Sequence, residues 1–182
     1  MKETNPENLH PQELEGKEFY AEKKYSLAAD AFSLAAQDYS NQGELLQAAE
    51  MRNNQGVSLL MAKNPKKALN AVLGTADLFK EEGDLLKQAM AIANEATALK
   101  DLGDNQQAIE KFLLAASIFD DINEPKLHLQ TQQSISALKF KTRNIPGALY
   151  SMQEGLEGLE KPSFRQKILL RLLRIPQNML EK

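Results

Sequence analysis

Few side chains in this sequence could perform chemistry, and none is arranged for catalysis or metal binding. Cysteine is absent, which excludes thiolate nucleophiles, disulfides and cysteine-ligated metals. The two histidines, His10 and His128, lie far apart in the chain, and we expect both at the surface. The acidic pairs at 81–82 and 120–121 lie where helices are expected to end, whereas a catalytic carboxylate pair requires burial. We therefore predict no catalytic residue, no metal and no cofactor.

The most informative polar residues are asparagines. An amide both donates and accepts hydrogen bonds, so it can bind a peptide backbone without requiring a charge. An alternative for Asn54 and Asn94 is that they bond the neighbouring helix and hold the repeats in register. The partner-binding set predicted from these amides and their register is Asn53, Asn54, Asn94, Lys100, Gln133 and Lys141.

A spacing of 40 residues organises the elements that must position these side chains. One face of an expected helix carries Ala68, Val72, Ala76 and Phe79. Similar residues recur 40 residues before them and both 40 and 80 residues after them. The other copies read Ala28, Phe32, Ala36, Tyr39; Ala108, Phe112, Ala116, Phe119; and Ala148, Met152, Leu156, Leu159. The helix caps Asn64, Asp104 and Asn144 and the helix exits Gly43, Gly83 and Asn123 keep the same step. Four copies without an insertion indicate a repeat array.

The repeat predicts an all-α fold of four antiparallel helix pairs. Helices are expected at about 11–23, 25–41, 44–62, 65–82, 84–102, 105–121, 125–142 and 145–160. After a flexible N-terminus over 1–10, the repeats would span about 11–43, 44–83, 84–123 and 124–162. Small residues at Gly16, Gly56, Ala96 and Ser136 should let the paired helices approach closely. The expected core includes Ala68, Ala76, Phe79, Ala108, Phe112 and Phe119.

These residues resemble tetratricopeptide (TPR) repeats over about 11–160. The segment 54–56 reads Asn-Gln-Gly, as in the first helix of the family pattern, and Ala68, Val72 and Ala76 supply its small–large–small series. The 40-residue period resembles the long-repeat TPR proteins of the kinesin light chain and SNAP type. The resemblance implies a right-handed α-solenoid whose first helices line a concave, partner-binding face. It does not extend to the subtype that grips a C-terminal carboxylate, because only Asn54 matches its clamp positions.

Residues 163–182 form a separate basic segment. Residues 161–182 hold six Lys/Arg and one acid, although the whole chain has a net charge of −3. A ninth helix is expected from Phe164 to about Arg174, ended by Pro176. Its apolar residues Phe164, Ile168, Leu169, Leu172, Leu173 and Ile175 form one arc, opposite Lys167, Arg171 and Arg174. We favour a capping helix, with Ile168 and Leu172 packed on Met152, Leu156 and Leu159. The alternative is a lipid anchor. We expect only one of these two roles, since a single apolar arc cannot easily pack on the array and also insert into lipid.

The overall composition favours a protein that binds other proteins. Hydrophobic residues make up 42% of the chain, enough for a core, and the net charge does not indicate nucleic-acid binding. No apolar run is long enough to span a membrane. We predict a cytoplasmic, non-enzymatic adapter that takes a peptide or an amphipathic helix of another protein in its groove. The alternative function is a membrane-peripheral adapter that uses the basic C-terminal helix. The oligomeric state is left open.

Overall fold

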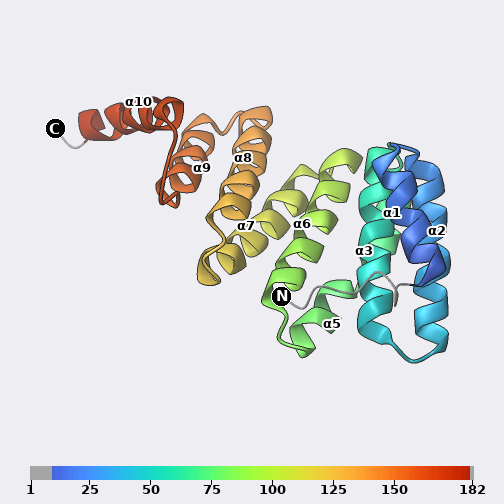
Figure 1. Ribbon diagram of the computed structural model, residues 1–182. Coiled ribbons are helices and arrows are strands. Elements are labelled where there is room, and N and C mark those ends of the chain that lie inside the picture. The colour runs from blue at the N-terminus through green and yellow to red at the C-terminus, as the bar shows by residue number, and fades with distance from the viewer. Residues whose placement is uncertain (1–9, 181–182) are drawn as a thin grey trace.

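The computed structural model describes residues 10–180, the last six by their backbone alone, and this part of the chain is all-helical (Figure 1). The helix pairs follow one another in a row from the N-terminus to the C-terminus. The all-helical solenoid prediction is confirmed, while the predicted flexible N-terminus lies outside the described residues except for His10. The helices are α1 (Pro11–Ala21), α2 (Tyr25–Asn41), α3 (Leu45–Met61), α4 (Pro65–Val72), α5 (Thr75–Glu81), α6 (Leu85–Leu102), α7 (Asn105–Asp121), α8 (Pro125–Lys141), α9 (Ile145–Glu157) and α10 (Phe164–Leu180).

A left-handed residue ends successive helices every 20 positions. In each turn the next amide bonds a carbonyl five residues back, as from Glu44 to Tyr39 (2.9 Å) and from Asp84 to Phe79 (2.9 Å). This bond satisfies carbonyls that the helix end leaves open. The left-handed positions are Lys23, Gly43, Lys63, Gly83, Gly103, Asn123 and Arg143. The helix ends predicted at Gly43, Gly83 and Asn123 are therefore confirmed. Of the other four left-handed positions in this series, three are Lys or Arg.

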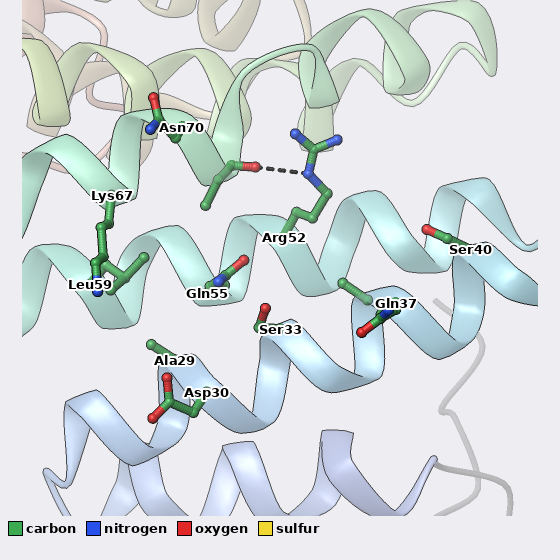
Figure 2. Close-up of a pocket in the computed structure, with 12 residues that line it drawn as sticks. Ala29, Asp30, Ser33, Gln37, Ser40, Arg52, Gln55, Leu59, Lys67 and Asn70 are labelled. Carbon is green, nitrogen blue, oxygen red and sulfur yellow. Dashed lines mark hydrogen bonds between the residues drawn. The ribbon is translucent and has the colours of Figure 1, made fainter.

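The single helix predicted over 65–82 is wrong, because the chain breaks into α4 and α5. Leu73 leaves the helical region with φ −56° and ψ 131°, and Gly74 takes a left-handed φ of 78°. Arg52 of α3 donates from Nε to the carbonyl of Ala71 (3.0 Å; Figure 2) and from Nη2 to that of Leu73 (2.8 Å). The hydroxyl of Thr75 donates to the Val72 carbonyl (2.7 Å). These bonds replace the helical hydrogen bonds that the break removes.

The predicted close approach within each pair is present where the first helix carries glycine. A Cβ atom added at Gly16 would lie 2.8 Å from the Phe32 ring, and one added at Gly56 would clash with Val72. In the fourth pair Ser136 takes this position, and its hydroxyl donates to the Ala148 carbonyl (2.7 Å). The small residue therefore decides how near the second helix can lie.

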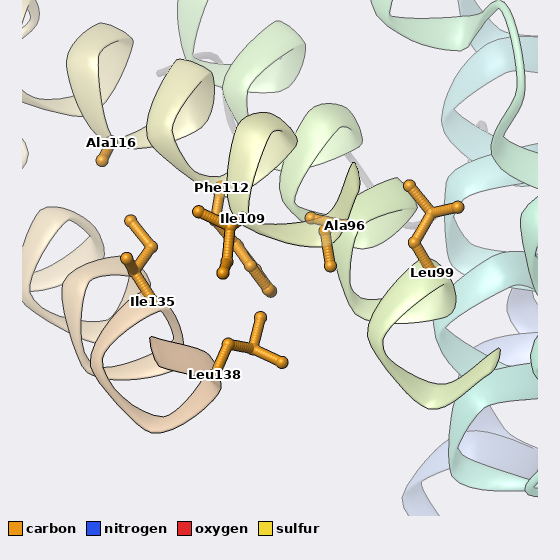
Figure 3. Close-up of a cluster of buried hydrophobic side chains, with 8 residues drawn as sticks. Ala96, Leu99, Ile109, Phe112, Ala116, Ile135 and Leu138 are labelled. Atoms are coloured by element: carbon orange, nitrogen blue, oxygen red, sulfur yellow. The ribbon is translucent and has the colours of Figure 1, made fainter. Parts of the chain in front are cut away.

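The hydrophobic core consists of several clusters of side chains between neighbouring helices and has no single centre. The largest cluster lies between α6, α7 and α8, where Phe112 is surrounded by aliphatic side chains (Figure 3). Its members are Ala96, Leu99, Ala108, Ile109, Phe112, Ala116, Ile135 and Leu138. Of the expected core, Ala68, Phe79, Ala108, Phe112 and Phe119 are buried, whereas Ala76 is half-buried.

The C-terminal helix differs from its prediction in length and in packing. α10 continues past Pro176 to Leu180, because one proline removes a single helical amide and need not end the helix. Ile168 and Leu172 do not pack into the array and remain 46% and 56% exposed. The fourth pair nevertheless keeps Leu156 buried, at 2% exposure. The side chain of Ile175 lies outside the described residues.

Replacing Phe112 by alanine should lower the free energy of unfolding by about 3–5 kcal/mol, because it empties an aromatic site 3% exposed. Urea denaturation measures the change. The neighbouring Leu113→Ala, at a side chain 44% exposed, is the matched control and should cost less than about 1 kcal/mol. Equal losses for the two variants would contradict this core.

Thr75→Val should destabilise the chain by about 1–3 kcal/mol, because the valine is isosteric but leaves the Val72 carbonyl and the Asn53 amide without the hydroxyl between them. Guanidinium denaturation gives the value. Thr142→Val removes an exposed hydroxyl that bonds only its own helix, so it is the control and should change little. Unchanged stability in Thr75→Val would show that this network does not hold the break.

Candidate functional site

A groove lies between the first helices α6 and α8, with α7 as its floor. It encloses about 240 Å³, and the described residues that line it are all uncharged. Amide and hydroxyl groups alternate there with apolar side chains, so the surface can bond a peptide backbone and also hold apolar side chains. The lining residues are Met90, Ala93, Asn94, Thr97, Phe112, Phe119, Leu127, Gln130, Thr131 and Ser134. We call this feature the α6–α8 groove.

Of the predicted binding residues, Asn94 lines this groove. Its Nδ2 is 3.3 Å from Oδ1 of Asn53, a long hydrogen bond between α6 and α3. Asn54 is half-buried on α3, at the position one repeat before Asn94. Ser134 occupies the same position one repeat later, on the far wall of the groove. The register therefore places an amide or a hydroxyl on each of three successive first helices.

Asn53 has a different environment from its neighbour. Its side chain is buried, at 9% exposure, and Nδ2 donates to the Ala49 carbonyl (3.1 Å) and to Oγ1 of Thr75 (2.8 Å). Oδ1 accepts from Asn94. These bonds tie α3 to the start of α5, so Asn53 supports the helix break and is not exposed to a partner.

The remaining predicted contacts are accessible but lie outside the groove lining. Lys100 is half-buried and lies 3.6 Å from Asp101, while Gln133 is exposed. Lys141 is exposed and donates to Asn105 over 3.4 Å. Sequence reasoning missed Met90, Thr97 and Gln130, for which the repeat pattern gave no distinguishing signal.

An ion pair joins α3 to α6, the first helices of two neighbouring repeats. Lys87 donates to Oε2 of Glu50 (2.8 Å), and this bond raises the pKa of the Lys87 ammonium above its usual value. Lys87 also approaches Asp84, the residue whose carboxylate caps α6. The pair links the first helices of neighbouring repeats at their edge.

A second hollow lies between α2 and α4, with α3 residues also in its lining (Figure 2). It encloses about 500 Å³ and includes Asp30, Arg52 and Lys67 among its lining residues. Arg52 is committed to the carbonyls at the helix break. We call this feature the α2–α4 hollow; unlike the α6–α8 groove, it has charged side chains in its lining.

The histidines divide between two environments. His10 packs against Tyr39 and lies 3.4 Å from Asp38. The surface prediction for His128 is wrong, since it is 5% exposed and its Nε2 lies 3.2 Å from Nε2 of Gln132. Glycine at 158 leaves room for the ring, whose Nδ1 would meet any added Cβ at 3.1 Å. Within the described part of the chain, no cluster of three or more His, Cys, Asp or Glu side chains could hold a metal.

Comparison with known proteins gives two kinds of match. Tryptophan–tRNA ligases from two Campylobacter jejuni strains are 26% identical over 132 residues, which is 70% of this chain. The chain spans only 41% of the length of these ligases, so the match does not carry their activity to it. The model of the family described as soluble NSF attachment protein, SNAP, matches residues 14–154, nearly the whole helical array. The chain therefore belongs to the SNAP family of helical adapters.

Proposed function

We propose that this chain is a non-enzymatic adapter that binds a peptide or an amphipathic helix of another protein along its first-helix surface. The uncharged α6–α8 groove is the observation that carries the proposal. Family membership supports it, because the name of the family describes soluble proteins that attach to another protein. A cytoplasmic location is part of the same proposal and fits a sequence without cysteine.

The groove chemistry favours an uncharged or weakly charged stretch of the partner. Asn94, Gln130 and Ser134 can bond its backbone or its small polar side chains. Met90, which is 47% exposed, offers a flexible thioether that adapts to apolar side chains of different shapes. An extended segment or one face of a helix would meet both kinds of group.

The proposed surface extends beyond the groove along the repeat register. Asn54 continues the amide position onto α3, and Gln133 offers an exposed amide on α8. Lys100 and Lys141 add accessible positive charges near the ends of α6 and α8. We propose these residues as contacts for polar or acidic side chains that flank the bound stretch, and we leave out the buried Asn53.

Site-specific cross-linking tests where the partner binds. Because the sequence has no cysteine, a thiol-linked photocrosslinker can be attached through Ser134→Cys in the groove. Ser33→Cys places the same probe in the α2–α4 hollow as a matched control. In extract of the native source, we expect one protein to cross-link through position 134 and not through position 33. Equal capture at both positions, or capture only at position 33, would contradict groove binding.

Once that partner is purified, Asn54→Ala combined with Asn94→Ala should weaken its binding about ten- to thirtyfold, because each lost neutral hydrogen bond contributes about 1 kcal/mol. The melting temperature should change little, since the hydrogen bond from the Asn94 amide to Asn53 is long (3.3 Å). Gln37→Ala with Asn70→Ala in the α2–α4 hollow is the control and should leave affinity unchanged. If stability collapses while affinity per folded molecule holds, the two asparagines are structural.

A further inference from the structure

The C-terminal helix carries two apolar stripes, and the repeat array covers only one. At 100° per residue, Leu170 and Leu173 lie on the same side as Gln166, and all three are half-buried. The other stripe turns away from the array and is open to solvent. Its members and their exposed fractions are Phe164 79%, Ile168 46%, Leu169 40% and Leu172 56%. Leu170, which lies outside the predicted arc, joins Leu173 on a packing side that is separate from the open stripe.

An exposed ion pair joins α10 to α9. Arg174 donates to Oε1 of Glu157 on α9 from both Nε (3.1 Å) and Nη2 (2.8 Å). The bond from Arg174 lowers the pKa of the Glu157 carboxyl below its usual value. Leu170 and Leu173 thus lie on the packed side of α10, while the open stripe is exposed in the same arrangement.

Positive charge borders the open stripe. Lys167 and Arg171 are exposed and lie next to Phe164 around the helix, and Arg165 lies within the stripe. Residues 161–182 carry a net charge of +5, which leaves −8 on the rest of the chain. A surface that combines large apolar side chains with a cationic border matches a lipid interface with anionic headgroups, where apolar groups insert and long basic side chains reach the phosphates.

We propose that the open stripe of α10 is a lipid-binding surface for membranes that contain anionic headgroups. A symmetric second copy fits this stripe poorly, because it would bring two cationic borders together. Attachment through the last helix also directs the acidic part of the chain away from the anionic surface. Within the described residues, no helix is long and apolar enough to cross a membrane. The proposal is independent of peptide binding in the α6–α8 groove, which lies on other helices.

Vesicle sedimentation of the full chain tests the proposal. The probes are vesicles of phosphatidylcholine alone and vesicles that also contain phosphatidylserine. Phe164→Ser with Leu172→Gln removes apolar groups from the stripe, and Leu34→Ser with Leu114→Gln changes leucines elsewhere that are 53% and 50% exposed. Lys167→Ala with Arg171→Ala removes charge, and Lys66→Ala with Lys126→Ala is its control at exposed lysines. Circular dichroism verifies that each variant is folded.

We expect the unmodified chain to sediment with vesicles that contain phosphatidylserine and not with vesicles of phosphatidylcholine alone. Added salt should reduce the bound fraction, because it screens the charges. The apolar pair should abolish it, and the charge pair should weaken it about 25-fold, since each basic side chain near an anionic surface contributes roughly fivefold. Both control pairs should bind like the unmodified chain. The proposal is overturned if the chain does not sediment, or if the stripe and control variants bind alike. It is also overturned if the chain is a dimer that the apolar pair converts to a monomer without any vesicle binding.

Discussion

The array depends on a close approach that repeats every 40 residues. In the first two pairs a glycine on the first helix faces a larger residue on the second, as Gly16 faces Phe32 and Gly56 faces Val72. Because no added Cβ would fit at either glycine, this contact sets how near the two helices lie. The second helix can then turn its other apolar side chains toward the next pair, and the core forms between repeats. The 40-residue register therefore determines both how the helices pack and which side chains lie on the first helices.

The fold could be predicted because its determinants are local and periodic. The pair structure follows from a repeat without insertions, and the exits at Gly43 and Gly83 follow from glycine's tolerance of positive φ. The break before Thr75 could not be predicted, because it depends on carbonyls bonded by Arg52 from another helix. Gly74 alone is also compatible with a continuous helix. The register of α10 likewise depends on packing against α9, which periodicity does not specify.

The candidate site, like the fold, could be predicted only in part from the sequence. Asn94, which the repeat register predicts as a groove residue, lines the α6–α8 groove. The register could not separate the adjacent Asn53 and Asn54, since only the helix break supplies Thr75 as a buried partner for the first of them. His128 was misplaced for a comparable reason, because its pocket is completed by Gly158 at the C-terminal end of α9. Neighbouring positions on one helix acquire different roles through contacts that sequence spacing does not reveal.

The central claim is that the first helices of this SNAP-family array present an uncharged groove to a partner protein. A crystal structure of the chain bound to the interacting segment of its partner tests it most directly. The account predicts that the segment lies between α6 and α8, with polar contacts to Asn94 and Ser134 and apolar contacts to Met90 or Leu127. A segment bound instead in the α2–α4 hollow, or held only by α10, would contradict it.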